Sequence, residues 1–97
     1  MDFNESTLWM DFRAFVQERN CRIAPDAAKE IRALIAHGVA ELNRSEYPLY
    51  MIEDAKRRLL LFANEMIKLA KRQHTQLLTA DIFQTVKEDL CPVRPYC

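Results

Sequence analysis

Apolar residues recur at helical spacing through most of the 97-residue chain, and the pattern is strongest over residues 51–73. In that stretch two adjoining rows of apolar side chains step by three and four residues, as they do on one side of an α-helix. The first row is Ile52, Ala55, Leu59, Phe62, Met66 and Leu69, and the second is Leu60, Ala63, Ile67 and Ala70. Together the rows are wider than the stripe of about 100° that an ordinary surface helix buries. We therefore expect a long central helix that is covered on two sides.

Three shorter patterns of the same kind predict helices at about residues 6–19, 25–43 and 79–90. Pro25 stands at the first position of the second helix, where a missing amide donor costs nothing, and Thr79 opens the last helix as its N-cap. Pro48 interrupts the pattern before the central helix. A single glycine and few β-branched residues leave little that favours strands. The sequence therefore predicts one all-α domain over residues 1–97, with four helices.

Composition and targeting signals narrow the class of protein. With 49% apolar residues, the chain is too hydrophobic to be a disordered segment. No apolar run approaches the ~20 residues that a membrane span needs, and the N-terminus lacks the basic and apolar regions of a secretory signal. We therefore expect an intracellular protein, either of the cytoplasm and nucleoid or of the nucleus, with no membrane partner.

Cysteine and histidine residues show no pattern typical of a reactive site. Cys21, Cys91 and Cys97 are an odd number in no zinc-like spacing, so free thiols are the simplest interpretation, with a metal site or a disulfide as alternatives. Because they fall in a connection and a tail, we expect them to be exposed and dispensable. Neither His37 nor His74 has a partner in a recognisable catalytic motif. The sequence predicts no catalytic residue, no metal site, no cofactor and no enzyme activity.

Charge is balanced overall but uneven along the chain. Fourteen basic and fourteen acidic residues give a formal net charge of zero, which argues against the strongly basic coating of DNA that many chromosomal proteins provide. Residues 44–74 nevertheless hold seven positive and four negative charges, most of them on the polar strip of the central helix. Either an ordinary solvated helix surface or an edge that faces phosphates accounts for this excess.

Two of the shorter helices carry apolar or small residues whose role needs an explanation. The helix at residues 6–19 holds more large apolar side chains than a small core needs, and either core packing or a subunit interface accounts for Trp9, Phe12 and Phe15. Gly38 lies inside the next helix, where glycine costs about 1 kcal/mol relative to alanine. We therefore expect Gly38 to mark the close approach of another helix.

The segment AKRQHTQLLTADIFQTVKEDL combines a basic helix end, a brief loop and a Thr-x-Asp opening of a short amphipathic helix. This arrangement resembles the end of the histone fold, and the resemblance covers about residues 51–90. Comparable positions are Lys71, Arg72, His74, Thr75, Leu78, Thr79, Asp81 and Ile82. The loop departs from that family in lacking its usual adjacent Arg-Lys-Thr, and the helix at 25–43 is longer than the family's first helix.

Two other alignments of the same chain are possible. CRIAPDAAKEI also resembles the start of a histone central helix, in which case residues 44–50 interrupt that helix and residues 6–19 form the family's first helix. The RIAPDAA opening, the proline break and the Thr-x-Asp helix also look like the small helical lid of AAA-type ATPases of the minichromosome-maintenance and chelatase kind. The chain has no phosphate-binding glycine loop, so it is not expected to be the ATPase itself.

The resemblance to the histone fold implies that two chains cross their central helices and share one core, as a homodimer or as a heterodimer with another histone-fold chain. The interface candidates are Trp9, Phe12, Phe15, Leu59, Phe62 and Met66. The resemblance also implies contact with duplex DNA through paired loops and helix ends, with little reading of bases. The candidates for this contact are Arg22, Lys56, Arg57, Arg58, Lys71, Arg72, His74 and Thr75. A helical adaptor that binds protein and no nucleic acid is the alternative function.

Overall fold

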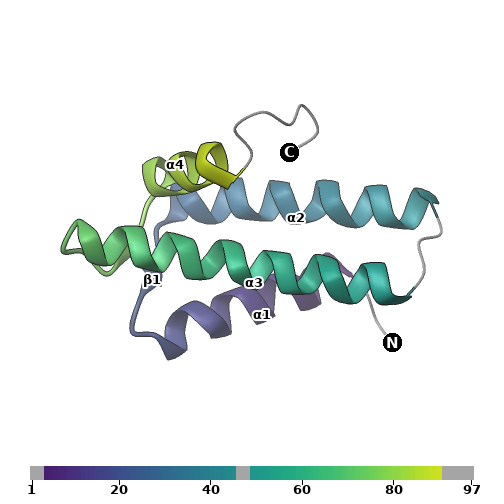
Figure 1. Cartoon of the computed structure of the whole chain (residues 1–97), viewed down its shortest axis with the longest axis horizontal. Helices are drawn as coiled ribbons and strands as arrows, with labels where there is room; N and C mark the ends of the chain where they lie inside the picture. The colour runs from purple at the N-terminus through teal and green to yellow at the C-terminus, as the bar shows by residue number, and fades with distance from the viewer. Residues whose placement is uncertain (1–3, 46–48, 91–97) are drawn as a thin grey trace.

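The computed structural model describes residues 4–45 and 49–90, which form four helices and two very short strands (Figure 1). The helices are α1 (Glu5–Glu18), α2 (Pro25–Ser45), α3 (Leu49–Arg72) and α4 (Ala80–Leu90), and the strands are β1 (Arg22–Ile23) and β2 (Leu77–Leu78). The predicted all-helical fold with four helices is confirmed. Each helix begins and ends within two residues of its predicted bounds. The break predicted at Pro48 lies outside the described residues.

Local sequence explains where the helices begin. The Asn4 side chain caps α1, because its Oδ1 accepts a hydrogen bond of 2.9 Å from the Thr7 amide. Pro25 is the first residue of α2, as the sequence predicts. Thr79 caps α4 through a bond of 3.4 Å from the Ile82 amide to its Oγ1. The two caps satisfy amides that have no partner inside the helix, and Pro25 has no amide donor to satisfy.

The four helices enclose one core. α1 packs against α2 and α3, and α4 packs against the same two helices. All four helices and β2 contribute buried residues, and none of the buried residues in the described part of the chain is polar or charged. The largest fully buried side chains are Phe12, Phe83, Ile31, Met66, Leu78 and Val16. Burial of this apolar surface is the main force that holds the helices together.

The two halves of α3 differ in how completely they are covered. In the C-terminal half Phe62, Met66 and Ala70 are buried, whereas in the N-terminal half Ile52 and Leu59 are only half-buried. The reason is that α4 is short: it has only 11 residues and lies beside the C-terminal half of α3 (Figure 1). The chain therefore covers the C-terminal half of its double apolar row by itself, and that half needs no second chain.

A feature that the sequence does not predict joins the two loops at one end of the bundle. β1 and β2 pair in parallel, with Arg22 opposite Leu77 and Ile23 opposite Leu78. The Arg22 amide donates to the Gln76 carbonyl at 2.8 Å, and the Ala24 amide donates to the Leu78 carbonyl at 2.9 Å. The loop after α1 and the loop after α3 therefore lie side by side, although they are far apart in the sequence.

Gly38 differs from its expected role. It is exposed, and a Cβ atom added at this position would meet nothing within 4 Å, so no helix of the described chain approaches it closely. Replacing Gly38 with alanine is therefore expected to raise the free energy of unfolding by about 1 kcal/mol, because alanine has the higher helix propensity. Urea denaturation followed by circular dichroism measures this gain. A loss of stability instead would show that another chain packs against Gly38.

Cys21 also differs from its expected role. It is a free thiol, but it is 3% exposed and belongs to the core rather than to an exposed connection. The structural reason is that the chain on either side of β1 turns inward, so that Cys21 and Ala24 are both buried. Serine at this position would place a hydroxyl group in an apolar site, so Cys21 is not freely replaceable. Cys91 and Cys97 lie outside the described residues.

Candidate nucleic-acid interface

The loop after α1 is shaped by a left-handed residue at the end of the helix. Asn20 has a φ angle of 61°. Its amide donates to the Gln17 carbonyl at 3.0 Å, and the Cys21 amide donates to the Val16 carbonyl at 3.2 Å. This pair of bonds is the Schellman pattern, in which a residue with positive φ ends the helix and satisfies its last carbonyls. Asparagine is one of the few residues other than glycine that adopt this conformation readily.

The loop after α3 repeats the same arrangement with a histidine. His74 has a φ angle of 58°, and its amide donates to the Lys71 carbonyl at 3.0 Å. The Thr75 amide donates to the Ala70 carbonyl at 2.9 Å. Both chain reversals therefore use one local motif, and each is followed within a few residues by a strand of the parallel pair. The sequence signal for this motif was available in Asn20, which stands just after a predicted helix.

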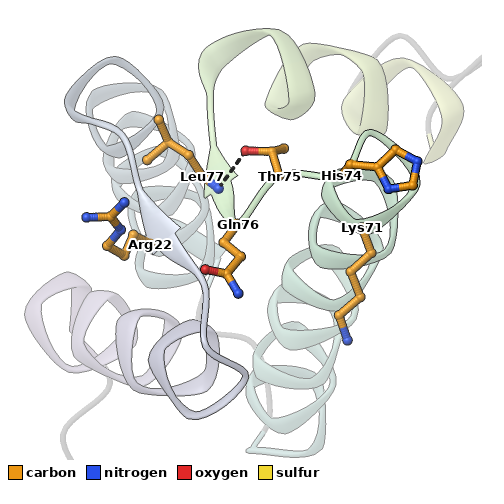
Figure 2. A pocket seen from close by; sticks show the side chains of 6 residues that line it. All are labelled: Arg22, Lys71, His74, Thr75, Gln76 and Leu77. Atoms are coloured by element: carbon orange, nitrogen blue, oxygen red, sulfur yellow. Dashed lines mark hydrogen bonds between the residues drawn. The ribbon is translucent and has the colours of Figure 1, made fainter.

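The two loops together form an open depression of ≈580 Å³ at this end of the bundle. We call the residues that line it the loop edge: Arg22, Lys71, His74, Thr75, Gln76 and Leu77. Figure 2 shows Arg22 on β1 at one side and Lys71 and His74 at the other, with Gln76 and Thr75 between them. The Thr75 hydroxyl oxygen accepts a bond of 3.1 Å from the Leu77 amide, which holds the turn before β2. Four of the residues expected to bind DNA therefore line the same depression.

The charges at the loop edge have one sign. Arg22 and Lys71 are exposed, and neither forms an ion pair with another described residue. Of the described residues, none that lines the depression is acidic. Two cations without a nearby neutralising carboxylate attract anions more strongly than cations that are already paired. The arrangement therefore favours an anionic ligand.

Arg72 is placed differently from its neighbour Lys71. It is exposed, but it does not line the depression, because one residue along an α-helix turns the side chain by about 100°. Arg72 lies instead on the face of α3 that carries Lys68, four residues before it, and Leu61, eleven residues before it. Of the expected basic pair, only Lys71 belongs to the loop edge.

The other three expected DNA-binding residues lie apart from the loop edge. Lys56, Arg57 and Arg58 precede Lys71 by 13 to 15 residues on the same helix, which is a distance of about 20 Å along its axis. The Asp54 carboxylate pairs with Arg57 at 3.7 Å and with Arg58 at 2.9 Å. Asp54 stands three and four residues before these arginines, a spacing that favours helical ion pairs and is readable from the sequence. The structure does not bring this cluster to the depression.

The residues proposed as a dimer interface fall into two groups. Phe12, Phe62 and Met66 are buried inside the core of one chain, where they offer little surface to a second copy. Trp9, Phe15 and Leu59 are half-buried and pack against the same core. The Trp9 ring stacks with Phe12 at a centroid distance of 6.3 Å, and the Arg19 guanidinium lies 3.4 Å from the centroid of the Phe15 ring. Most of the aromatic surface of α1 is therefore used within the chain.

Other site types receive little support from the described part of the chain. Within residues 4–45 and 49–90, no group of three or more histidine, cysteine, aspartate or glutamate side chains is placed to hold a metal ion. Within the same residues, no helix is both long enough and apolar enough to cross a membrane.

Replacing His74 with glycine is expected to raise the free energy of unfolding by about 1 kcal/mol, because glycine adopts a positive φ angle without the steric cost of a side chain. His37 provides a matched control, since it is exposed on α2 with helical geometry. Glycine at His37 is expected to lower stability by about 1 kcal/mol. Urea denaturation of the two variants tests the opposite signs. A loss of stability for the His74 variant would contradict the left-handed conformation of that loop.

Comparison with protein-family models, with curated proteins and with solved structures finds no match to this chain.

Proposed function

We propose that the chain binds the phosphate backbone of duplex DNA through the loop edge. The observation that carries this proposal is the convergence of Arg22 and Lys71, from loops far apart in the sequence, on one depression without an acidic neighbour among its lining residues. Lysine, arginine and hydroxyl side chains are the usual partners of DNA phosphates. Thr75 and His74 add further polar groups at the same place. Contacts of this kind position a protein on DNA and do not read sequence.

The shape of the depression favours an extended ligand over a small molecule. A typical small-molecule site is an enclosed cleft with mainly apolar walls that buries most of its ligand. The loop edge is open, and five of its six lining residues are polar or charged. A polymer with regularly spaced phosphates can contact both loops at once without being enclosed, so a nucleic-acid backbone fits this surface best.

The neutral net charge limits how strongly such binding occurs. The chain carries as many acidic as basic residues, so few cations beyond those of the loop edge favour approach to DNA. We therefore expect binding that is measurable at low ionic strength and weak near physiological salt, where the Debye length is about 8 Å. The resemblance to the histone fold supports the same function, with a second copy or another histone-fold chain as the expected protein partner.

A helical adaptor without nucleic-acid binding is the second candidate. It is favoured by large apolar side chains that α3 leaves exposed, among them Tyr50, Met51 and Leu61. Tyr50 and Met51 are adjacent at the start of α3, and neighbouring exposed apolar side chains are typical of a protein-binding surface. On this interpretation the loop edge is an ordinary solvated surface, and the chain acts by holding another protein.

Fluorescence anisotropy with two unrelated DNA duplexes, each titrated at several salt concentrations, distinguishes the two functions. We expect similar affinities for both duplexes and a linear decrease of log K with log salt concentration, since counterions are released from each neutralised phosphate. A short anionic polymer without bases, such as heparin, should compete with both. If neither duplex binds even at low ionic strength, DNA binding is excluded and the adaptor function becomes the leading candidate.

A further inference from the structure

The outward face of α3 carries a charge pattern that is symmetric about one leucine. Leu61 is 55% exposed near the middle of this helix, although leucine is among the residues most often buried. Charged residues lie on the same face at four and seven residues before and after it, and two further arginines, Arg58 and Arg72, lie at three residues before and eleven residues after it. We call Asp54, Arg57, Leu61, Glu65 and Lys68 the outer stripe.

The order of charges along the outer stripe is negative, positive, neutral, negative, positive. If a second identical helix runs in the opposite direction with Leu61 at the centre, position −7 meets +7 and position −4 meets +4. Asp54 then faces Lys68, and Arg57 faces Glu65, each twice because of the two-fold axis. A parallel arrangement in register would instead place each residue opposite its own copy, so that like charges repel. The pattern is therefore self-complementary in the antiparallel direction only.

The side chains of the outer stripe are accessible to a second copy. Leu61 is 55% exposed and the four charged side chains are between 38% and 77% exposed, so the stripe is not covered by the described chain. Its present ion pairs lie within the helix: Asp54 pairs with Arg57 at 3.7 Å and with Arg58 at 2.9 Å, and Lys68 pairs with Glu65 at 3.5 Å. Exposed pairs of this kind contribute little to folding, so exchanging or sharing these partners between two chains costs little.

We propose that the outer stripe is the docking surface for a second copy of this chain, which packs its own α3 antiparallel with Leu61 against Leu61. The contact is isologous, as in most two-fold dimers. It uses a different face of α3 from the buried row that includes Phe62 and Met66, so both chains keep their own cores. The apolar area at its centre is small, and the association is therefore weak and sensitive to salt. The inference goes beyond DNA binding and does not require it.

The antiparallel dimer also bears on DNA binding, and only this consequence rests on the proposed function. Residue 71 of one copy lies opposite residue 51 of the other, so the two Lys71 positions are about 30 Å apart along the helix axis. One turn of duplex DNA is about 34 Å. The two loop edges of a dimer are thus spaced to contact one side of a duplex at points about one turn apart.

Sedimentation equilibrium of the whole chain without DNA, over concentrations from about 10 μM to 1 mM and at low salt, tests the dimer. The wild-type chain is expected to associate reversibly. Leu61→Asp is expected to lower the association constant by more than about tenfold, because it places two carboxylates at the centre of the contact. Met10→Asp is the matched control, since Met10 is 67% exposed on α1, away from the outer stripe, and is expected to leave association unchanged. A wild-type chain that stays monomeric throughout overturns the proposal, as does an equal effect of Met10→Asp.

Charge reversal gives a second measurement, whose expected result, recovery of association in a double variant, cannot be produced by misfolding. Arg57→Glu and Glu65→Arg each create two repulsive pairs in the dimer, and each is expected to lower the association constant by about tenfold. The double variant Arg57→Glu/Glu65→Arg restores opposite charges at both places and is expected to return to within about threefold of wild type. Circular dichroism checks that all variants keep their helical content. If the double variant associates no better than the single ones, the antiparallel contact is wrong. DNA binding is measured separately, so the failure of one proposal leaves the other intact.

Discussion

Replacing Phe62 with alanine is expected to lower the free energy of unfolding by about 3–5 kcal/mol, because a large ring is removed from a packed core and a cavity remains. Phe62 is 8% exposed, and its ring lies 5.3 Å from the ring of Phe83, measured between centroids. This contact attaches the short helix α4 to α3. Urea denaturation followed by circular dichroism, at two protein concentrations, measures the loss.

The dependence of this stability loss on protein concentration shows whether Phe62 lies in the core of one chain or in a dimer interface. If the ring is covered by the chain's own helices, the loss is the same at both concentrations, whereas an interface residue gives a loss that varies with concentration. Leu61→Ala is the control on the neighbouring position of α3. Because Leu61 is exposed, its loss is expected to stay below about 0.5 kcal/mol when the chain is dilute. A loss below about 1 kcal/mol for Phe62→Ala would show that the buried face of α3 is misassigned.

The double substitution Arg22→Gln/Lys71→Gln is expected to weaken binding to every duplex alike. If each side chain contacts one phosphate, the slope of log K against log salt concentration falls in magnitude by ~0.9 for each residue and ~1.8 for both. The same relation gives a loss of affinity of roughly 60-fold at about 0.1 M salt. Fluorescence anisotropy at several salt concentrations measures both quantities. Stability should change little, because exposed charges contribute little to folding.

Two further variants serve as controls for this prediction. Arg44 lies at the far end of α2 and pairs with Glu41 at 3.4 Å, so Arg44→Gln removes a charge without touching the loop edge. Its slope should equal that of the wild-type chain. Arg72→Gln should have a smaller effect than Lys71→Gln, because Arg72 does not line the depression. If Arg44→Gln weakens binding as much as Arg22→Gln, the loss reflects net charge and not a defined site.

Much of this fold follows from local pattern. The spacing of apolar residues predicts all four helices, and Pro25 and Thr79 mark two of their starts. The resemblance to the histone fold implies DNA contact through the paired loops of a dimer, whereas the structure brings Arg22 and Lys71 together within one chain. The parallel strands were not predicted, because two-residue strands carry no periodic signal and pair residues far apart in the sequence.

The interface residues show a different limit of sequence reasoning. The double row on α3 correctly indicates a helix covered on two sides, but it does not say which helix provides the cover. For Phe62 the cover is α4 of the same chain, whose short apolar face meets the row directly. Gly38 shows the same limit, because the sequence cannot distinguish a glycine selected for close packing from one in open space.

The pairing of β1 with β2 makes the loop edge a property of the completed fold. Arg22 and Leu77 are 55 residues apart in the chain, and neither half of the protein can form the depression alone. The unfolded chain holds the two loops apart, so a ligand that spans both binds the native state almost exclusively. Such a ligand shifts the folding equilibrium by mass action, by about 2.7 kcal/mol when its concentration is 100 times its dissociation constant. A polyanion that occupies the loop edge would therefore act as a removable cross-link between the two loops. Local opening of the loops and release of the ligand would then be the same event.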